Sequence, residues 1–265
     1  PGGNLKGRAK TGLVGLARAL SKLGICSRTQ AWALIDAGEV EVNGHICRDP
    51  DYPIHPESAE IKIQSKPVGA QQRVYLALNK PRGLVTTRQD EKGRATVYDC
   101  FDATDLPYVS PVGRLDQASE GLLLFSNDSK WSAGITDPAT QLDKIYHLQI
   151  GLLPDIAFLA RLRQGIVVEG ELLRVKSTHE LRRGGRNAWL EVTLDEGKNR
   201  HLRRLLKAAG AEVLRLIRIA IGPVKLGDLA KGQWRHLMPD EVQLLRRDPP
   251  ARRRSPAATS PGRER

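Results

Sequence analysis

The segment PVGRLDQASEGLLLFSND, residues 111–128, places one aspartate ahead of an unbroken apolar run. The run, Leu122–Phe125, is short and is bounded by Gly121 and Asn127, which predicts a buried strand. Asp116 precedes the run and is separated from it by small and polar residues. We therefore expect Asp116 on a loop at the point where the chain enters the core.

Further strand patterns lie on both sides of this segment, with only a few helical patterns among them. The expected strands are at residues 73–81, 121–128, 144–151, 166–177 and 187–197. Strand runs with few crossover helices indicate an α+β domain built on a mixed, mainly antiparallel sheet. No glycine-rich phosphate loop follows a strand, so a nucleotide cofactor is not indicated.

A separate pattern near the N-terminus predicts two short helices followed by a hairpin. Ser27 and Gln30 have the spacing of a capping box, which predicts the start of the second helix. The strand pattern after it ends at Asn43-Gly44, a strong hairpin signal. The expected layout is a basic flexible segment at 1–12, this small domain at 13–63, a linker at 64–73, a larger domain at 74–247 and a disordered basic tail at 248–265.

The chain carries a net charge of +12 over 265 residues. Such an excess favours a polyanionic partner, because clustered Lys and Arg release counterions from phosphates. The small domain does not share it, since residues 13–63 hold five cations and seven anions, a net −2. No stretch has the length of an apolar membrane span, and no signal peptide is evident. We expect a cytoplasmic protein with no membrane partner.

The three cysteines, Cys26, Cys47 and Cys100, show no CxxC pairing, and their number is odd. Neither a disulfide framework nor a zinc site is therefore indicated. His45 and Cys47 can face the same side of a strand, but no fourth ligand is placed nearby. We interpret the cysteines as structural thiols in a reducing compartment, and we expect no metal.

A helix is expected from about residue 199, within the segment EGKNRHLRRLLKAAG. Its apolar residues recur at helical spacing and form a stripe that faces a core. A second stripe with the same spacing consists of the cations Arg200, Arg203, Arg204 and Lys207. This stripe is either the solvated face of a surface helix or a phosphate-binding face, and the spacing alone does not decide between them.

Several motifs together resemble one known family. GRLD at 113–116, KIY at 144–146 and EGKNRHLRRLL at 196–206 look like the active-site motifs of the ribosomal RNA pseudouridine synthases that carry an S4 domain. The segments at 76–87, 93–99 and 214–237 extend the match, and those at 20–44 and 48–50 resemble the S4 RNA-binding domain. The resemblance spans nearly all of residues 13–245, with independent motifs in the same order.

The resemblance implies roles for individual residues. Asp116 matches the catalytic aspartate, Tyr146 the tyrosine that packs on the target base, and Arg203 the basic residue that pairs with the aspartate. His201 stands where the family often has Gln. The further substrate contacts that it implies are Arg114, Lys80, Lys198, Asn199, Arg200, His201, Arg204 and Lys207. The candidate RNA contacts outside the cleft are Arg18, Lys22 and Arg28 on the S4 helices, and Arg182, Arg183 and Arg186 in a basic turn.

The implied reaction breaks the N1–C1′ bond of a uridine, turns the uracil and rejoins it through C5, with no metal or organic cofactor. The implied partner is ribosomal RNA or a ribosome assembly intermediate, with large-subunit RNA favoured over small-subunit RNA and the protein acting as a monomer. Two other functions compete with this one. They are a non-catalytic S4-type RNA-binding protein and a hydrolase that pairs Asp116 with Glu120.

Overall fold

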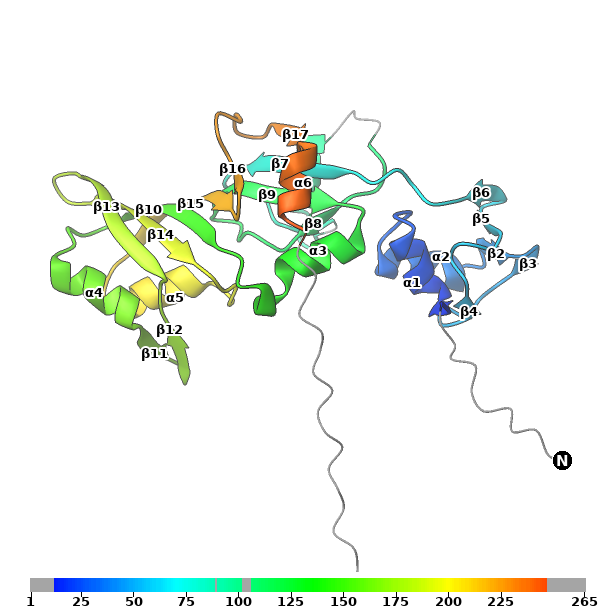
Figure 1. Cartoon of the computed structure of the whole chain (residues 1–265), viewed down its shortest axis with the longest axis horizontal. Coiled ribbons are helices and arrows are strands. Elements are labelled where there is room, and N and C mark those ends of the chain that lie inside the picture. Colours follow the sequence, from blue (N-terminus) through cyan, green and yellow to red (C-terminus); the bar gives the residue numbers. More distant parts are fainter. Residues whose placement is uncertain (1–11, 89, 102–105, 247–265) are drawn as a thin grey trace, which may run out of the picture.

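The computed structural model describes residues 12–88, 90–101 and 106–246. The basic segment expected at 1–12, apart from Gly12, and the tail expected at 248–265 lie outside these ranges. Two units follow one another along the chain and are joined by an extended connector (Figure 1). No helix within the described ranges is long and apolar enough to cross a bilayer.

The N-terminal unit contains the two helices and the hairpin that the sequence predicts. Ser27 caps the second helix, because its hydroxyl accepts from Gln30 N (3.1 Å) while Gln30 Oε1 accepts from Ser27 N (3.0 Å), which confirms the capping box. Asn43 and Gly44 both have positive φ, as a tight hairpin turn requires. The elements are β1 (Val14–Gly15), α1 (Leu16–Lys22), α2 (Arg28–Asp36), β2 (Val40–Val42), β3 (His45–Ile46), β4 (Pro53–Ile54), β5 (Ile61–Ile63) and β6 (Lys66–Val68).

The small sheet of this unit has the order β3-β2-β5-β6, and β1 pairs with β4. The last strand, β6, lies inside the segment expected to be a linker. Gln64 and Ser65, both with positive φ, turn the chain back so that β6 pairs with β5. The connector to the larger unit therefore begins only after Val68.

The larger unit is built on one mixed sheet with the order β13-β14-β10-β15-β9-β7-β17. All of its pairings are antiparallel except that of β15 with β9, which confirms the predicted α+β class. The strands are β7 (Tyr75–Lys80), β8 (Ser110–Val112), β9 (Glu120–Ser126), β10 (Lys144–Ile150), β13 (Ser177–Arg183), β14 (Ala188–Leu194), β15 (Val213–Ile221), β16 (Val224–Lys225) and β17 (Trp234–His236).

Helices cover both faces of this sheet, and a short hairpin projects from it (Figure 1). The hairpin, β11 (Ile166–Val168) and β12 (Glu171–Leu173), forms a separate two-stranded sheet. The strand expected at residues 166–177 is therefore two short strands joined by a turn. The helices are η1 (Val97–Phe101), α3 (Ser129–Thr136), η2 (Pro138–Thr140), α4 (Ile156–Gln164), α5 (His201–Ala208) and α6 (Pro239–Leu244).

Strand β9 is the centre of the fold, and every one of its residues is buried. Leu123 and Phe125 belong to the core that includes residues of α4 and α5, while Leu122 and Leu124 belong to the core on the opposite face. A strand covered on both faces has no polar side, so its sequence is a continuous apolar run instead of an alternating one. The predicted buried strand is therefore confirmed.

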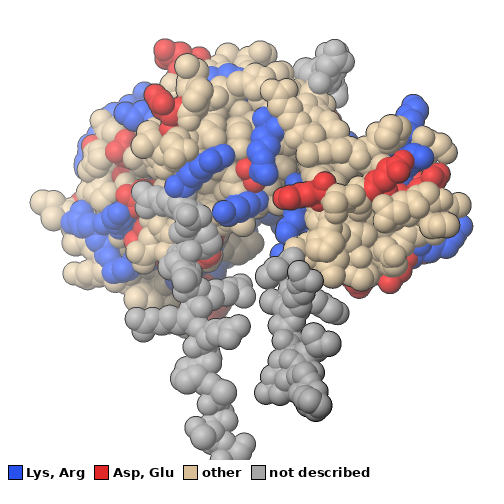
Figure 2. All heavy atoms as spheres, turned by 45° about the vertical axis from the view of Figure 1, so that its right-hand side comes forward, with Lys and Arg blue, Asp and Glu red and all other residues tan. Residues whose placement is uncertain are grey.

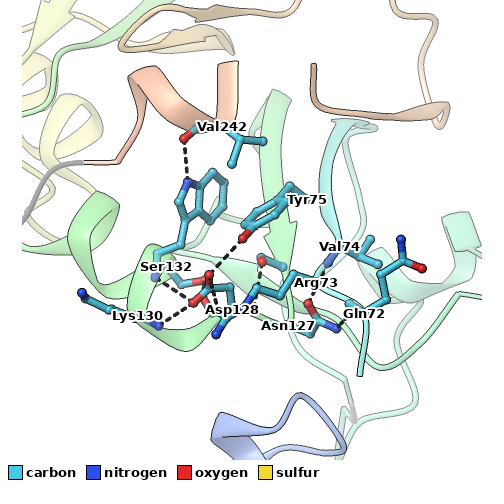
Figure 3. A network of polar contacts seen from close by, with 11 residues as sticks. Gln72, Arg73, Val74, Tyr75, Asn127, Asp128, Lys130, Ser132 and Val242 are labelled. Carbon is cyan, nitrogen blue, oxygen red and sulfur yellow. Dashed lines mark hydrogen bonds and ion pairs between the residues drawn. The ribbon is translucent and has the colours of Figure 1, made fainter. Parts of the chain in front are cut away.

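The end of β9 holds the connector to the N-terminal unit (Figure 3). Asn127 Oδ1 accepts from Val74 N (2.8 Å), and its Nδ2 donates to Gln72 O (2.8 Å). Asp128 accepts from the Tyr75 hydroxyl (2.9 Å) and forms an ion pair with Arg73. Gly24 of the small unit packs against Asn127, where a Cβ would lie 3.1 Å from Asn127 Nδ2. The two units thus meet at the C-terminal end of β9.

Candidate active site

The three motif segments meet around one cleft of about 690 Å³. The loop before β9, the start of β10, the loop before α5 and the middle of β15 form its walls. A volume of this size lies in the range of small-molecule sites. The residues of chemical interest in the lining are Arg114, Asp116, Lys144, Tyr146, Lys198, Asn199, Arg200, His201, Arg203 and Arg218.

Asp116 lies on the loop ahead of β9, as expected, and its side chain is 35% exposed. Its loop is fixed through the backbone. Lys80 Nζ donates to Asp116 O (3.2 Å) and to Ser119 O (2.8 Å), and Thr86 Oγ1 donates to Leu115 O (2.7 Å). The carboxylate is consequently free to face the cleft while the main chain behind it is held.

Lys80 was expected to line the cleft, but it is 0% exposed and lies beneath the Asp116 loop. Its Nζ makes three hydrogen bonds, all to backbone carbonyls, the third being Pro81 O (3.1 Å). Burial lowers the pKa of Lys80 to about 8, against the opposing effects of Asp116 and Glu120. Its position makes it a support for the loop that carries the aspartate.

The lowered pKa of Lys80 predicts a specific pH dependence of stability. Between pH 8 and pH 10 the unfolded chain binds more protons at this lysine than the folded chain does, so the folded form gains stability as pH rises. We expect the free energy of unfolding of the wild type, minus that of Lys80→Met, to rise by up to about 1.4 kcal/mol per pH unit across this window. Urea denaturation at pH 7, 8, 9 and 10 measures this difference. A flat difference would contradict the assignment.

Two arginines of the α5 segment approach Asp116. Arg203 was expected to pair with the aspartate, but one arginine contacts the carboxylate and the other contacts its loop. The ion pair to the carboxylate comes from Arg200, whose Nη1 lies 3.9 Å from Asp116 Oδ2. Arg203 Nη2 donates to Ala118 O (3.0 Å), in the same loop. Burial lowers the pKa of Arg203, and the nearby Asp116 opposes this shift. Arg200 has φ +47, a strained conformation of the kind that clusters at functional sites.

Tyr146 lies on β10 with 8% of its surface exposed, and it lines the cleft. Its neighbours across the sheet are Val192 on β14 and Arg218 on β15. Residues directly opposite one another in antiparallel strands point to the same face. Tyr146 and Arg218 therefore lie beside each other in the wall of the cleft.

The rest of the basic stripe does not act as one surface. Arg204 is bound by the β11–β12 hairpin, with Nη1 2.8 Å from Glu171 Oε2 and Nη2 3.2 Å from Glu169 Oε2. Lys207 is exposed in the last turn of α5. Lys198 donates to Leu172 O (2.9 Å) of the same hairpin. The expectation of a direct substrate contact therefore fits Arg200 better than Arg204.

His201 was also expected to contact substrate, yet it is only 4% exposed at the start of α5. Its Nδ1 lies 3.5 Å from Glu196 Oε1, outside a regular hydrogen bond. Burial lowers the pKa of His201, with Glu196 acting in the opposite direction. Asn199 and Arg114, in contrast, are exposed residues of the cleft lining.

The basic segment expected as a turn forms the end of β13 and the turn into β14, and it lies away from the cleft. Lys144 and Leu194 are paired at the cleft end of β10 and β14, whereas Ile150 and Ala188 are paired at the other end, next to the turn. Arg182 stacks on Trp189 (4.8 Å), Arg183 binds Glu180 and Pro154 O, and Arg186 is exposed. The structure thus does not bring Arg182, Arg183 and Arg186 to the site.

The cations expected on the small unit are all exposed. Arg18 and Lys22 lie on α1, and Arg28 begins α2. Basic and acidic side chains alternate over this unit, on the right in Figure 2, in keeping with its small net charge.

Glu120 cannot serve as the partner of Asp116 in a hydrolytic pair. It is 3% exposed, and Arg215 (2.8 Å) and Lys231 (2.9 Å) bind its carboxylate. The Arg215 hydrogen bonds, with help from Lys231, lower the pKa of Glu120 to about 2 despite its burial. A carboxyl that stays ionised and occupied by two cations is unsuited to act as a general acid.

Sequence reasoning missed Arg218, which lines the cleft at 5% exposure. A signal for it was present. Arg215 and Arg218 are three residues apart on one strand, and side chains alternate between the faces, so the two must point to opposite faces. Two arginines on opposite faces of an otherwise apolar strand cannot both lie on one solvated side of the sheet.

The fold and the cleft together define a class of protein. An exposed carboxylate on a fixed loop, flanked by arginines and by a buried tyrosine, is suited to chemistry on a single nucleotide. The small unit adds a helical surface with exposed cations, which suits RNA backbone. The molecule is therefore an enzyme of the RNA-modifying class.

Comparison with known proteins gives the family. Residues 74–208 match the RNA pseudouridylate synthase family, and residues 14–61 match the S4 domain. An RNA pseudouridine synthase of Aquifex aeolicus is 38% identical over 88% of this chain and 93% of its own. The ribosomal large subunit pseudouridine synthase B of Bacillus subtilis is 33% identical over 87% of this chain and 95% of its own. A crystal structure of a pseudouridylate synthase superposes with a TM-score of 0.62 and 28% identity, covering 88% of this chain and 99% of the other.

The chain belongs to the RNA pseudouridylate synthase family and carries an N-terminal S4 domain. The resemblance of its motifs to that family is confirmed, and so is the catalytic interpretation over a binding-only one.

Proposed function

We propose that this enzyme isomerises one or a few uridines of ribosomal RNA to pseudouridine, with large-subunit RNA as the substrate. The observation that carries the proposal is the meeting of Asp116, Tyr146 and the arginines of the α5 segment in one cleft. The choice of ribosomal RNA is supported by similarity to enzymes named for the large subunit, in Bacillus subtilis and Haemophilus influenzae. The enzyme works as a cytoplasmic monomer on free RNA or on a ribosome assembly intermediate.

Asp116 supplies the reacting carboxylate in this proposal. It attacks the sugar or the base as a nucleophile, or it stabilises the positive charge on the sugar as the N1–C1′ bond breaks. The uracil keeps the electron pair of that bond, turns, and forms the C5–C1′ bond. The C5 proton then leaves, and N1 gains a proton, so that the atoms balance. Tyr146 packs on the uracil and takes part in removal of the C5 proton.

The cations line the substrate cleft and hold the aspartate in place. Arg200 forms a long ion pair with the Asp116 carboxylate, and Arg203 donates a hydrogen bond to the backbone of the same loop. The target base leaves its stack to enter the cleft, at a cost of a few kcal/mol that contacts to the base and to flanking phosphates offset. Arg114 and Arg200, both exposed at the cleft, are placed to hold those phosphates.

The proposal is tested by release of tritium from RNA labelled at uridine C5. Unmodified transcripts of large-subunit and small-subunit ribosomal RNA are incubated separately with the enzyme. We expect release from the large-subunit transcript alone. Release from the small-subunit transcript alone would overturn the choice of subunit. If only partly assembled particles are converted, the substrate is an assembly intermediate.

The S4 domain is expected to contribute affinity and not rate. Replacing Arg18, Lys22 and Arg28 together by Gln removes three exposed cations and should weaken RNA binding. The slope of log Kd against log salt should fall by about two to three, because each of the three lost phosphate contacts contributes roughly 0.7 to 0.9. The rate at saturating RNA should stay the same. Filter binding at several salt concentrations and single-turnover kinetics measure both.

A matched triple variant separates a specific surface from a general charge effect. Lys92, Arg161 and Lys225 are exposed cations of the larger unit outside the cleft lining, and their replacement by Gln changes the net charge equally. Equal losses of affinity in the two triple variants would contradict RNA docking on the S4 helices.

A further inference from the structure

Arg218 is a buried cation that the chemistry described above leaves without a role. It lies on β15, is 5% exposed and borders the cleft. Its Nε donates to Leu122 O (2.7 Å), and among the described residues neither terminal nitrogen has a hydrogen-bond partner. Nη2 is closed off by the protein, so Nη1 is the donor that remains for a ligand in the cleft. Within the part of the chain that the structure describes, Arg218 forms no ion pair. A buried guanidinium with unused donors is costly unless a ligand satisfies it.

A second cation lies next to Arg218 and makes the need for an electron-rich ligand stronger. Lys144 also lines the cleft, and its Nζ donates to Leu142 O (2.8 Å). Burial lowers the pKa of Lys144, and the charge of Arg218 lowers it further, while Asp143 and Asp195 act in the opposite direction. These two carboxylates offset part of the charge of Lys144. Arg218 itself forms no ion pair among the described residues, so its charge is left for a ligand.

The position of this charge relative to Tyr146 indicates what it binds. Lys144 and Tyr146 are two residues apart on β10, so their side chains lie on the same face, and both line the cleft. Arg218 lies directly opposite Tyr146 on β15. The pairing of β10 with β15 shifts register between Ile145 and Tyr146. Bulges of this kind often re-aim a side chain next to an active site. The guanidinium is thereby held beside the ring that packs on the target base.

We propose that Arg218 donates hydrogen bonds to a carbonyl oxygen, O2 or O4, of the target uracil and stabilises the negative charge that this base acquires. The inference rests on the proposed function and assigns a further substrate-contacting residue to that site. When the N1–C1′ bond breaks, its electron pair stays on the uracil and spreads to O2 and O4. A preorganised donor in a site without water stabilises developing charge of this kind strongly.

Atomic substitution in the RNA tests which oxygen is bound. The target uridine is replaced by 2-thiouridine or by 4-thiouridine, and single-turnover release of tritium from C5 is measured. Sulfur accepts hydrogen bonds poorly. The ratio of the uridine rate to the thiouridine rate therefore includes the contribution of the hydrogen bond to the replaced oxygen. Comparing this ratio between the wild type and Arg218→Gln isolates the contribution of the hydrogen bond from Arg218, as in a double-mutant cycle. We expect the ratio for one of the two analogues to fall at least tenfold in Arg218→Gln and to stay low in Arg218→Lys, which loses the planar fork. Unchanged ratios for both analogues would overturn the proposal.

A matched variant controls for damage to the strand. Arg215→Gln makes the same chemical change three residues away on β15, on the face opposite to the cleft. Whatever Arg215→Gln does to the overall rate, its uridine-to-thiouridine ratios should equal those of the wild type. If Arg215→Gln alters the ratios as Arg218→Gln does, the effect belongs to the strand and not to a contact with the base.

A binding measurement keeps the inference separate from the isomerase proposal. Barbiturate, a planar pyrimidine anion at neutral pH, serves as the probe in calorimetry with the full chain. We expect Arg218→Gln to weaken its binding at least tenfold and Arg215→Gln to leave it unchanged. Binding that depends on Arg218, together with no conversion of any transcript, would reject the proposed reaction but not the pyrimidine contact. No binding by the wild type would overturn the contact itself.

Discussion

Asp116→Asn is expected to lower the rate of pseudouridine formation by a thousandfold or more, roughly the loss seen when an enzyme is deprived of its reacting group. The amide has nearly the shape of the carboxylate but neither its charge nor its nucleophilicity. RNA affinity and thermal stability should stay near those of the wild type. The loop is held through Asp116 O and Ser119 O, which the substitution leaves in place. Among the described residues the side chain makes one ion pair, a long one to Arg200.

Tritium release under single-turnover conditions measures the rate, and filter binding measures the affinity. Asp155→Asn is the matched control, because Asp155 caps α4 outside the cleft lining and an asparagine caps a helix equally well. Substantial turnover by Asp116→Asn would show that another group carries the reaction. A parallel loss of folding and of binding would show that the aspartate is structural.

Gly121→Ala is expected to be the most destabilising single substitution that we consider. Gly121 is the second residue of β9, has φ +99 and lies where β9 and β15 pair in parallel. A Cβ at this position would be 2.2 Å from Arg218 O and 2.8 Å from Arg218 N. Both are backbone atoms, so the two central strands would have to separate. We expect a loss of about 3 to 5 kcal/mol in the free energy of unfolding, from backbone strain together with overpacking.

Gly170→Ala separates these two causes. Gly170 has φ +77 in the β11–β12 turn, and no heavy atom of the described residues lies within 4 Å of the Cβ that an alanine would add. It should therefore show only the conformational cost, about 1 to 2 kcal/mol. Urea denaturation of the two variants measures the difference. Equal losses would contradict the close approach of β9 and β15.

The sequence predicted elements whose signal is local. The capping box of Ser27 and Gln30 and the Asn43-Gly44 turn depend on neighbouring residues alone, and both occur in the structure. The apolar run at Leu122–Phe125 required burial on both faces, and the structure provides it. Such features could be predicted because no distant contact is needed to decide them.

The details of the site could not be predicted in the same way. The helical spacing shows that Arg203 and Arg204 lie on the polar side of α5, but it does not show which of them faces the cleft. Arg204 points away from the cleft because it binds Glu169 and Glu171 of the β11–β12 hairpin, which are distant in sequence. Lys80 looked like a cation for the cleft, but three backbone carbonyls from neighbouring loops satisfy it in the interior. Long-range partners of this kind leave no mark in the local sequence.

Strand β9 has a further consequence, because its two ends serve different domains. The loop ahead of it carries Asp116, and the residues after it, Asn127 and Asp128, anchor the connector to the S4 domain. Seven residues of fully buried strand span about 20 Å and cannot stretch. In the function proposed above, the strand fixes the distance between the S4 domain, where RNA is proposed to bind, and the carboxylate that is proposed to react. We expect the enzyme to select a uridine that lies at this distance from the RNA segment bound by the S4 helices.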